Sequence, residues 1–250
     1  MKLALECPAS LLEQVQPLAD FDFILAHLVL SDSAYADFYR GSTRTKILDN
    51  SVNELLEPLS LDQLKRAAEV VHPDLVVAPD YLGDSEKTIS ALDRAINVFG
   101  KGKVLPVVQG STLREALDCS DYLHSELFTS VAVPYDITSR RTDSLEVLAA
   151  GRQAVVMGLE SSFSTIHLLG LTCLEELEAY RSSRKVVSID TGSPVLHGLR
   201  GLRFGRDRML AKAIPTLEQM GSPAGFEVDQ GDVDFESIYY NIAYLRGLLR

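Results

Sequence analysis

The architecture can be inferred from one segment, Val186-Val187-Ser188-Ile189-Asp190-Thr191-Gly192-Ser193. Residues of high strand propensity run into a carboxylate, and Gly192 then turns the chain. A carboxylate at the carboxyl end of a buried strand is rigidly held and faces an open rim. Earlier apolar segments end in the same way, at Asp49, at Asp80, and at Gln109 followed by Gly110. We expect these ends to converge on one polar pocket.

Short apolar segments alternate along the chain with segments of helical pattern. This alternation is typical of βα units, and eight such units close a barrel. We therefore predict a single-domain α/β protein, a (β/α)8 TIM barrel over about residues 1–200 of 1–250, with a C-terminal helical extension over about 201–250; a doubly wound open sheet is the alternative. The predicted strands are residues 2–7, 21–29, 46–49, 75–78, 104–108, 127–133, 165–169 and 186–189.

Helix starts are indicated by a hydroxyl or carboxylate followed three residues later by Glu or Gln, which lets the two side chains satisfy free backbone amides. Helices are expected after residues 31 and 84, and the segment 235–249 has the pattern of an amphipathic helix. The capping patterns begin at Ser10, Ser51, Ser60, Thr112, Asp143 and Thr172.

Composition narrows the class of protein. The chain has 250 residues, of which 46% are hydrophobic, so a large core is expected. A net charge of −11 argues against a surface coated in basic residues. Cys7, Cys119 and Cys173 form no C-x-x-C pair, so neither a disulfide framework nor a cysteine zinc site is expected. The apolar segment at the amino terminus is too short for a secretion signal, and no apolar run reaches the about 20 residues that span a bilayer, so we expect a cytosolic protein.

The polar residues at the strand ends each have a simpler explanation. Asp49, Asp80 and Asp190 could each stabilise a local turn, and Gln109 could be an exposed loop residue, since Asx turns are common. Four such residues, all at predicted strand ends, are harder to explain in this way, because the loops after the strands of a barrel build its active site.

The motifs also resemble those of a known family in their order and approximate spacing between residues 47 and 190. The family is the tRNA-guanine transglycosylase (queuine tRNA-ribosyltransferase) superfamily, and the chain is most similar to its compact phage and bacterial relatives that act on DNA and lack the zinc site. The matching segments are Leu48-Asp49-Asn50-Ser51, Asp80, Val108-Gln109-Gly110-Ser111, His167-Leu168-Leu169-Gly170 and Ser188-Ile189-Asp190-Thr191.

The resemblance implies base exchange in a polynucleotide, more readily DNA than tRNA, in which a 7-deazaguanine such as preQ0 replaces guanine. Asp190 would be the nucleophile that forms an aspartyl-glycosyl intermediate, and Asp49 the general acid/base. Asp80 would accept hydrogen bonds from the guanine N1–H and amine. Gln109 and the Gly110 amide would donate to O6.

The same resemblance places Asn50 in the substrate site and implies no metal or redox cofactor. The partners would be nucleic acid and a free 7-deazaguanine, with no membrane. The protein would act in the cytoplasm, or in the host cytoplasm if a phage encodes it, and a homodimer is left open.

Phosphate contacts require cations. Candidates lie after the sixth predicted strand and after the proposed nucleophile: Arg140, Arg141, Arg200, Arg203 and Arg206. Two other functions stay open. One is a nucleoside hydrolase or metal-dependent hydrolase that uses the aspartates. The other is a degenerate barrel that binds a base without catalysis.

Overall fold

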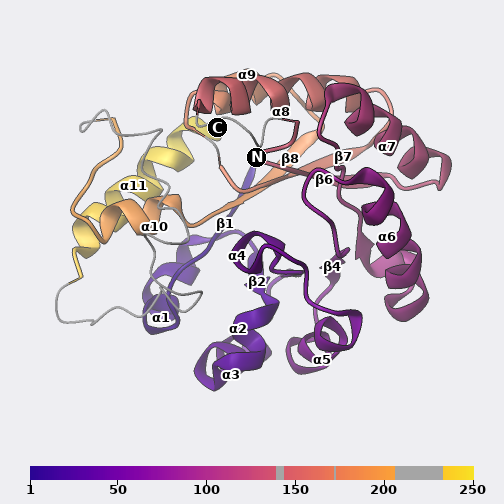
Figure 1. Ribbon diagram of the computed structural model, residues 1–250. Helices are drawn as coiled ribbons and strands as arrows, with labels where there is room; N and C mark the ends of the chain where they lie inside the picture. The colour runs from indigo at the N-terminus through magenta and orange to yellow at the C-terminus, as the bar shows by residue number, and fades with distance from the viewer. Residues whose placement is uncertain (139–143, 172, 206–232) are drawn as a thin grey trace.

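The computed structural model describes residues 1–138, 144–171, 173–205 and 233–250. It is an α/β fold with two four-stranded parallel sheets, whose strand orders are β2-β3-β4-β5 and β1-β8-β7-β6. The strands lie in the centre of the molecule and helices surround them (Figure 1). Strand bounds are β1 Lys2–Leu5, β2 Asp22–Leu25, β3 Lys46–Asp49, β4 Leu75–Val77, β5 Val104–Leu105, β6 Ser130–Pro134, β7 Thr165–Leu169 and β8 Val186–Thr191.

Helices connect successive strands and cover the outer faces of the sheets. None of the helices in the described ranges is both long and apolar enough to cross a bilayer. Short 3-10 turns occur at Ala9–Leu11 (η1), Gln16–Leu18 (η2) and Lys101–Lys103 (η3). The α-helices are α1 Leu12–Val15, α2 Ala26–Ser31, α3 Ser33–Gly41, α4 Val52–Leu55, α5 Leu61–Val71, α6 Ser85–Phe99, α7 Leu113–Ser125, α8 Leu145–Leu159, α9 Glu176–Tyr180, α10 Ser193–Gly198 and α11 Phe235–Leu248.

The two sheets touch at both pairs of edges. Beyond β5, Val107 bridges to Ala132 of β6 in parallel. The Val108 amide donates to the Ala132 carbonyl at 3.0 Å, and the Ala132 amide donates to the Pro106 carbonyl at 2.9 Å. At the other edges, the amide of Asp20, just before β2, donates to the Leu3 carbonyl of β1 at 2.7 Å.

Parallel pairing brings the carboxyl ends of the strands to one end of each sheet. In the ladders, Ala4 of β1 lies opposite Asp190 of β8, and Leu25 of β2 lies opposite Asp49 of β3. The strands are buried along most of their length, as expected for parallel strands covered by helices. The core includes the fully buried Leu3, Leu5, Ile24, Leu48, Val77, Val131, Leu168 and Ile189.

Strand predictions agree with the structure except at some ends. The bounds of β3 and β7 coincide with those predicted. The predicted second strand is wrong beyond Leu25, because residues 26–31 form α2. The sixth strand begins at Ser130 rather than at Leu127, which has φ +62 and is 82% exposed. An apolar run alone does not separate a strand from the turn of helix that follows it.

Most of the predicted helix caps in the described residues are present. Ser60 forms the full capping box with Gln63, and Asp84 and Thr112 each accept a bond from a first-turn amide. The prediction at Ser10 is wrong, because the turn there begins at Ala9 and no side chain caps α1. The predicted caps at Asp143 and Thr172 lie outside the described residues.

The predicted capping box at Ser51 is also wrong, for a physical reason. Ser51 has φ +64, in the left-handed region, and makes no side-chain cap. Its hydroxyl instead accepts a hydrogen bond from the His27 amide at 3.1 Å, and its own amide donates to Asp49 at 2.7 Å. The turn after β3 is therefore shaped by its contacts with α2 and with Asp49.

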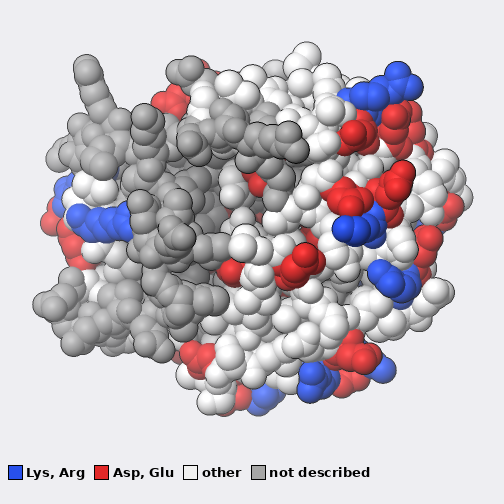
Figure 2. Space-filling view, viewed as in Figure 1, with Lys and Arg blue, Asp and Glu red and all other residues white. Residues whose placement is uncertain are grey.

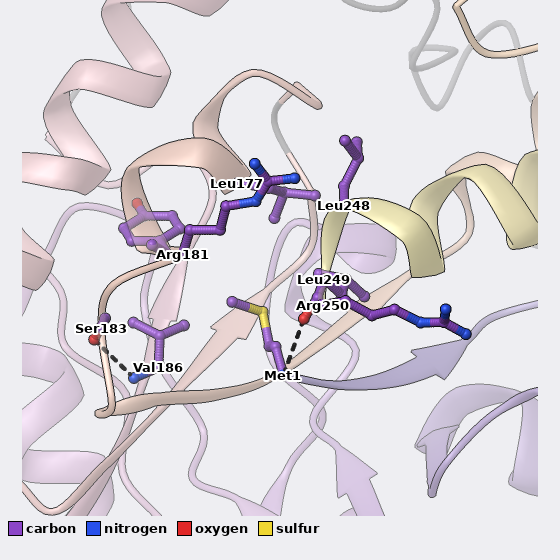
Figure 3. Close-up of a pocket in the computed structure, with 9 residues that line it drawn as sticks. Met1, Leu177, Arg181, Ser183, Val186, Leu248, Leu249 and Arg250 are labelled. Atoms are coloured by element: carbon purple, nitrogen blue, oxygen red, sulfur yellow. Dashed lines mark hydrogen bonds between the residues drawn. The ribbon is translucent and has the colours of Figure 1, made fainter.

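The C-terminal helix α11 packs against α10. The buried amide of Asn241 accepts a hydrogen bond from the Phe204 amide at 2.7 Å and donates to the carbonyls of Pro194 at 3.2 Å and Leu202 at 2.9 Å. At the end of the helix, the Leu249 carbonyl accepts a bond from the amino terminus of Met1 at 3.2 Å (Figure 3). These contacts fasten the extension to the first and last strands.

Candidate functional site

The two predicted catalytic aspartates lie in one buried cluster. Asp49 is the last residue of β3, and Asp190 is the second-to-last residue of β8. Their exposed fractions are 8% and 3%. Burial, the charge of Glu54 and the charges of Asp190 and Asp80 raise the pKa of Asp49 well above its usual range. The charges of Asp190 and Asp80 both act on Asp49, and such interactions weaken with distance, so the three carboxyl groups lie near one another.

Asp190 is held by contacts to both carboxylate oxygens. His167 Nε2 lies 2.9 Å from Oδ1, and the Gly170 amide donates to Oδ2 at 3.1 Å. The other imidazole nitrogen of His167 lies 2.9 Å from the Ser188 hydroxyl. The rings of Phe21 and Phe23 pack against the imidazole with centroids 6.0 and 5.6 Å away. The sequence motif indicated His167 and Gly170 but assigned them no role; in the structure they orient Asp190.

Glu6 is a site residue that the sequence analysis missed. It follows β1 directly, and its amide donates to the Thr191 carbonyl at 3.1 Å. Its side chain hydrogen-bonds to Asp190. Burial first, and then the Asp190 charge and this hydrogen bond, raise the pKa of Glu6 well above its usual range. The raised pKa favours the protonated form of Glu6, which can donate a hydrogen bond to Asp190. Glu6 could have been found by the pattern that selected the aspartates, a carboxylate directly after an apolar strand.

Glu54 was also missed, because it was interpreted as the partner of Ser51 in a capping box. It lies on α4, immediately after β3. Burial, and to a lesser degree the charge of Asp190, raise the pKa of Glu54. Within the described part of the chain, its buried Oε2 has no hydrogen-bond partner. A buried acceptor without a donor is costly, so this oxygen is available to a donor on a ligand.

The predicted base-reading residues form a hydrogen-bonded network beside the aspartates. Asn50 Nδ2 donates to Asp80 Oδ1 at 2.7 Å, and Gln109 Nε2 donates to Asp80 Oδ2 at 2.5 Å. Asn50 also donates to the Ala78 carbonyl at 2.7 Å, and the Gly83 amide donates to Gln109 Oε1 at 3.0 Å. Each carboxylate oxygen accepts more than one bond and each amide nitrogen has two hydrogens, so a base would share these groups with their present partners.

Gly110 has a packing role that the motif did not indicate. A Cβ at this position would lie 2.5 Å from the Ala116 amide nitrogen and 2.8 Å from the Glu115 carbonyl carbon. Its own carbonyl accepts a bond from the Thr138 amide at 3.2 Å. The backbone after β5 thus passes directly against α7. Donation from the Gly110 amide to a base stays a prediction.

The predicted phosphate contacts are only partly described. Arg200 is exposed just after α10. Arg203 forms an ion pair with Glu236 at 2.8 Å and lies over the Tyr240 ring at 5.4 Å, so it helps to hold α11. On the face drawn in Figure 2, the described Lys and Arg side chains are interspersed with acidic ones. Arg140, Arg141 and Arg206 lie outside the described residues, and phosphate binding by any of the five stays a prediction.

Two pockets in the described residues lie away from the carboxylates. One opens at the start of β8, between Met1, Leu177 and Leu249 (Figure 3). A second lies between α11 and the first turns of the chain, beside Leu18 and Ile242. Neither contains a cluster of acid–base groups, whereas the residues at the carboxyl ends of the strands do. We therefore place the candidate site at the carboxyl ends.

Two further findings bear on the site. In the described ranges, no set of His, Cys, Asp and Glu side chains has the arrangement of a metal centre. Comparison of the chain with protein-family models and with curated proteins gives no match.

Proposed function

We propose that the chain is a base-exchanging pentosyltransferase. It replaces guanine in a polynucleotide with a 7-deazaguanine such as preQ0, and the resemblance favours DNA over tRNA as that polynucleotide. The observation that carries this proposal is the pairing of Asp49 and Asp190 in different surroundings. Burial first, and then neighbouring charges, raise the pKa of Asp49, while Asp190 is contacted at both oxygens, by His167 and by the Gly170 amide. Two carboxyl groups with separate roles are what glycosyl transfer requires.

The proposal includes closure of the two sheets into a (β/α)8 barrel. Its support is the backbone bonding between Val108 and Ala132 at one pair of edges and between Asp20 and Leu3 at the other. In such a barrel the carboxyl ends of all strands surround one opening. Glu6, Asp49, Asp80 and Asp190 follow or end strands of both sheets, so closure would place them around the same sugar and base.

The chemistry takes two displacements at the anomeric carbon. In the first, Asp190 forms a bond to C1′ as the C1′–N9 bond of guanine breaks, and Asp49 gives its proton to the departing base. In the second, N9 of the incoming base bonds to C1′ and the C1′–Asp190 bond breaks. Asp49 takes the proton from that nitrogen and is restored. Glu6 donates to Asp190 throughout, which stabilises the charge of the aspartate when it leaves.

Base selection follows from the network around Asp80. A guanine-type base presents N1–H and an amine, both donors, and the carbonyl O6, an acceptor. Asp80 supplies acceptors, and Gln109 has a second amide hydrogen beyond the one it gives to Asp80. Adenine lacks the N1 donor and the O6 acceptor, and a buried polar site left unpaired rejects such an analogue strongly.

The test is to incubate DNA or tRNA with the protein and free preQ0 or labelled guanine, and to analyse the nucleosides by mass spectrometry. We expect incorporation that requires added base and that Asp190→Asn abolishes. Asp49→Asn should slow exchange by about 10²- to 10⁴-fold, the usual contribution of a general acid. Asp62→Asn, a change at an exposed aspartate on α5, is the matched control.

The outcomes separate the candidate functions. Release of guanine without incorporation would identify a hydrolase, since water then replaces the incoming base. Base binding without turnover would identify a non-catalytic barrel. Full exchange by Asp190→Asn would refute the proposed nucleophile.

A further inference from the structure

Arg152 is the largest side chain that is completely buried in the described residues, and it lies beside the candidate site. It comes from α8, on the outside of the strands. Its Nε donates to Glu176 of α9 at 3.0 Å, and its Nη2 pairs with the same carboxylate. A buried guanidinium is costly to desolvate, and replacing such a pair by apolar residues is often neutral for stability. Stability alone therefore does not account for the pair.

The remaining donors of Arg152 reach the loop that contacts Asp190. Its Nη1 donates to the Leu169 carbonyl at 3.1 Å and to the Gly170 carbonyl at 2.9 Å. The amide of that same Gly170 donates to Asp190 Oδ2 at 3.1 Å. The guanidinium thus holds the Leu169 carbonyl, which shares a peptide group with the Gly170 N–H, and also the carbonyl of the next peptide group.

The loop after β7 requires contacts from outside the loop to fix it, because its conformation is unusual. Gly170 has φ +69, a region that residues with a side chain rarely adopt. The Tyr135 ring packs so closely that a Cβ at Gly170 would lie 3.1 Å from Tyr135 Cδ1. A flexible glycine between β7 and α9 would not by itself keep its amide directed at one carboxylate oxygen. The guanidinium, with its planar array of donors, fixes both carbonyls at once.

We propose that Arg152 is a positioning residue: by holding the Leu169 and Gly170 carbonyls, it directs the Gly170 amide at Asp190. Glu176 in turn orients the guanidinium and balances its charge. The catalytic consequence depends on the proposed function, because Asp190 must present one oxygen to the anomeric carbon. The structural consequence does not depend on it.

The experiment uses the full-length double variant Arg152→Met/Glu176→Leu, which removes both charges together. Hydrogen exchange of the Gly170 amide, followed by NMR, reports on the bond to Asp190. We expect the protection of this amide to fall by at least about tenfold while the rest of β7 stays protected. We also expect kcat for base exchange to fall by about 10- to 100-fold, by analogy with the loss of supporting contacts around metal ligands, with KM for the free base unchanged.

A matched control is available at the opposite ends of the strands. Asp22 begins β2 and pairs with Arg44, and its side chain is also completely buried. Arg44→Met/Asp22→Leu makes the same chemical change and should leave both the Gly170 protection and kcat unaltered. If the Arg152 double variant does not fold, Arg152→Lys keeps the charge but not the planar array of donors, and it should show the same two losses.

The two measurements keep the inference separate from the proposed function. Unchanged Gly170 protection in a folded Arg152 variant would overturn the inference, whatever the activity. Lost protection with unchanged kcat would overturn the catalytic part. If the wild-type protein exchanges no base at all, the proposed function fails, and the Gly170 amide still decides whether Arg152 positions it.

Discussion

Replacing Glu6 by glutamine should make the stability of the fold less dependent on pH. Burial and the neighbouring Asp190, Glu54 and Asp49 raise the pKa of Glu6 well above its usual range. An unfolded glutamate titrates near pH ~4.3. Between that pH and the raised pKa, the folded protein therefore holds a proton that the unfolded chain has lost, and folding takes up a proton from solution.

The sign and size of the effect follow from proton linkage. The stability contribution is complete below the pKa of the unfolded side chain and is lost as pH rises toward the raised pKa of the folded state. One such proton changes the free energy of unfolding by about 1.4 kcal/mol per pH unit within this window. The raised pKa values of Asp49 and Glu54 act in the same direction. The wild-type protein should therefore be more stable near pH 5 than near pH 8.

Urea unfolding at a series of pH values measures the effect directly. Glu6→Gln keeps a donor toward Asp190 but cannot ionise, so the slope of stability against pH should decrease by up to about 1.4 kcal/mol per unit. The control Glu69→Gln changes an exposed glutamate on α5 and should leave the slope unchanged. Parallel curves for wild type and Glu6→Gln would refute the argument, because Glu6 would then have the same pKa in both states.

Two further predictions concern close packing of glycines. Gly198→Ala places a Cβ 2.4 Å from Ile238 Cγ1 and 2.6 Å from its Cα; we expect a loss of about 1–3 kcal/mol in urea unfolding as α11 is pushed from α10. Gly110→Ala places a Cβ 2.5 Å from the Ala116 amide nitrogen and should cost a similar amount and also lower base exchange. Gly102→Ala, with no atom within 4 Å of the new Cβ, is the control for both; equal stability of all three variants would contradict the packing argument.

Much of the fold could be predicted because the periodicity of hydrophobic residues and the capping of helices depend on residues that are adjacent in sequence. The apolar run before Asp49 and the capping box at Ser60 are specified by adjacent residues, and both are present in the structure. Errors occurred where a distant contact decides the conformation. The sequence around Ser51 predicts a helix cap. Its hydroxyl instead accepts a hydrogen bond from the His27 amide of a different helix, and no local sequence pattern predicts that contact.

The same distinction applies to the site. Asp49 and Asp190 could be selected from their positions at strand ends, and the parallel ladders bring such ends to one end of each sheet. Glu6 carried the same local signal, but its significance comes from the hydrogen bond to Asp190 at the other end of the chain. Arg152 gave no signal at all, because an arginine in a helix of ordinary pattern is usually exposed. Only the packing of α8 against the loop after β7 shows that it is buried.

A difference in ion pairing among the acidic side chains supports a functional role for the cluster. Asp22 and Glu176 are each paired with a guanidinium, from Arg44 and Arg152, as expected for buried charges that serve packing. By contrast, within the described residues no Lys or Arg forms an ion pair with Glu6, Asp49 or Glu54. Their proximity raises one another's pKa and lowers stability at neutral pH. Glutamine or asparagine would avoid that cost if structure were their only purpose, whereas proton transfer requires groups that can hold and release a proton.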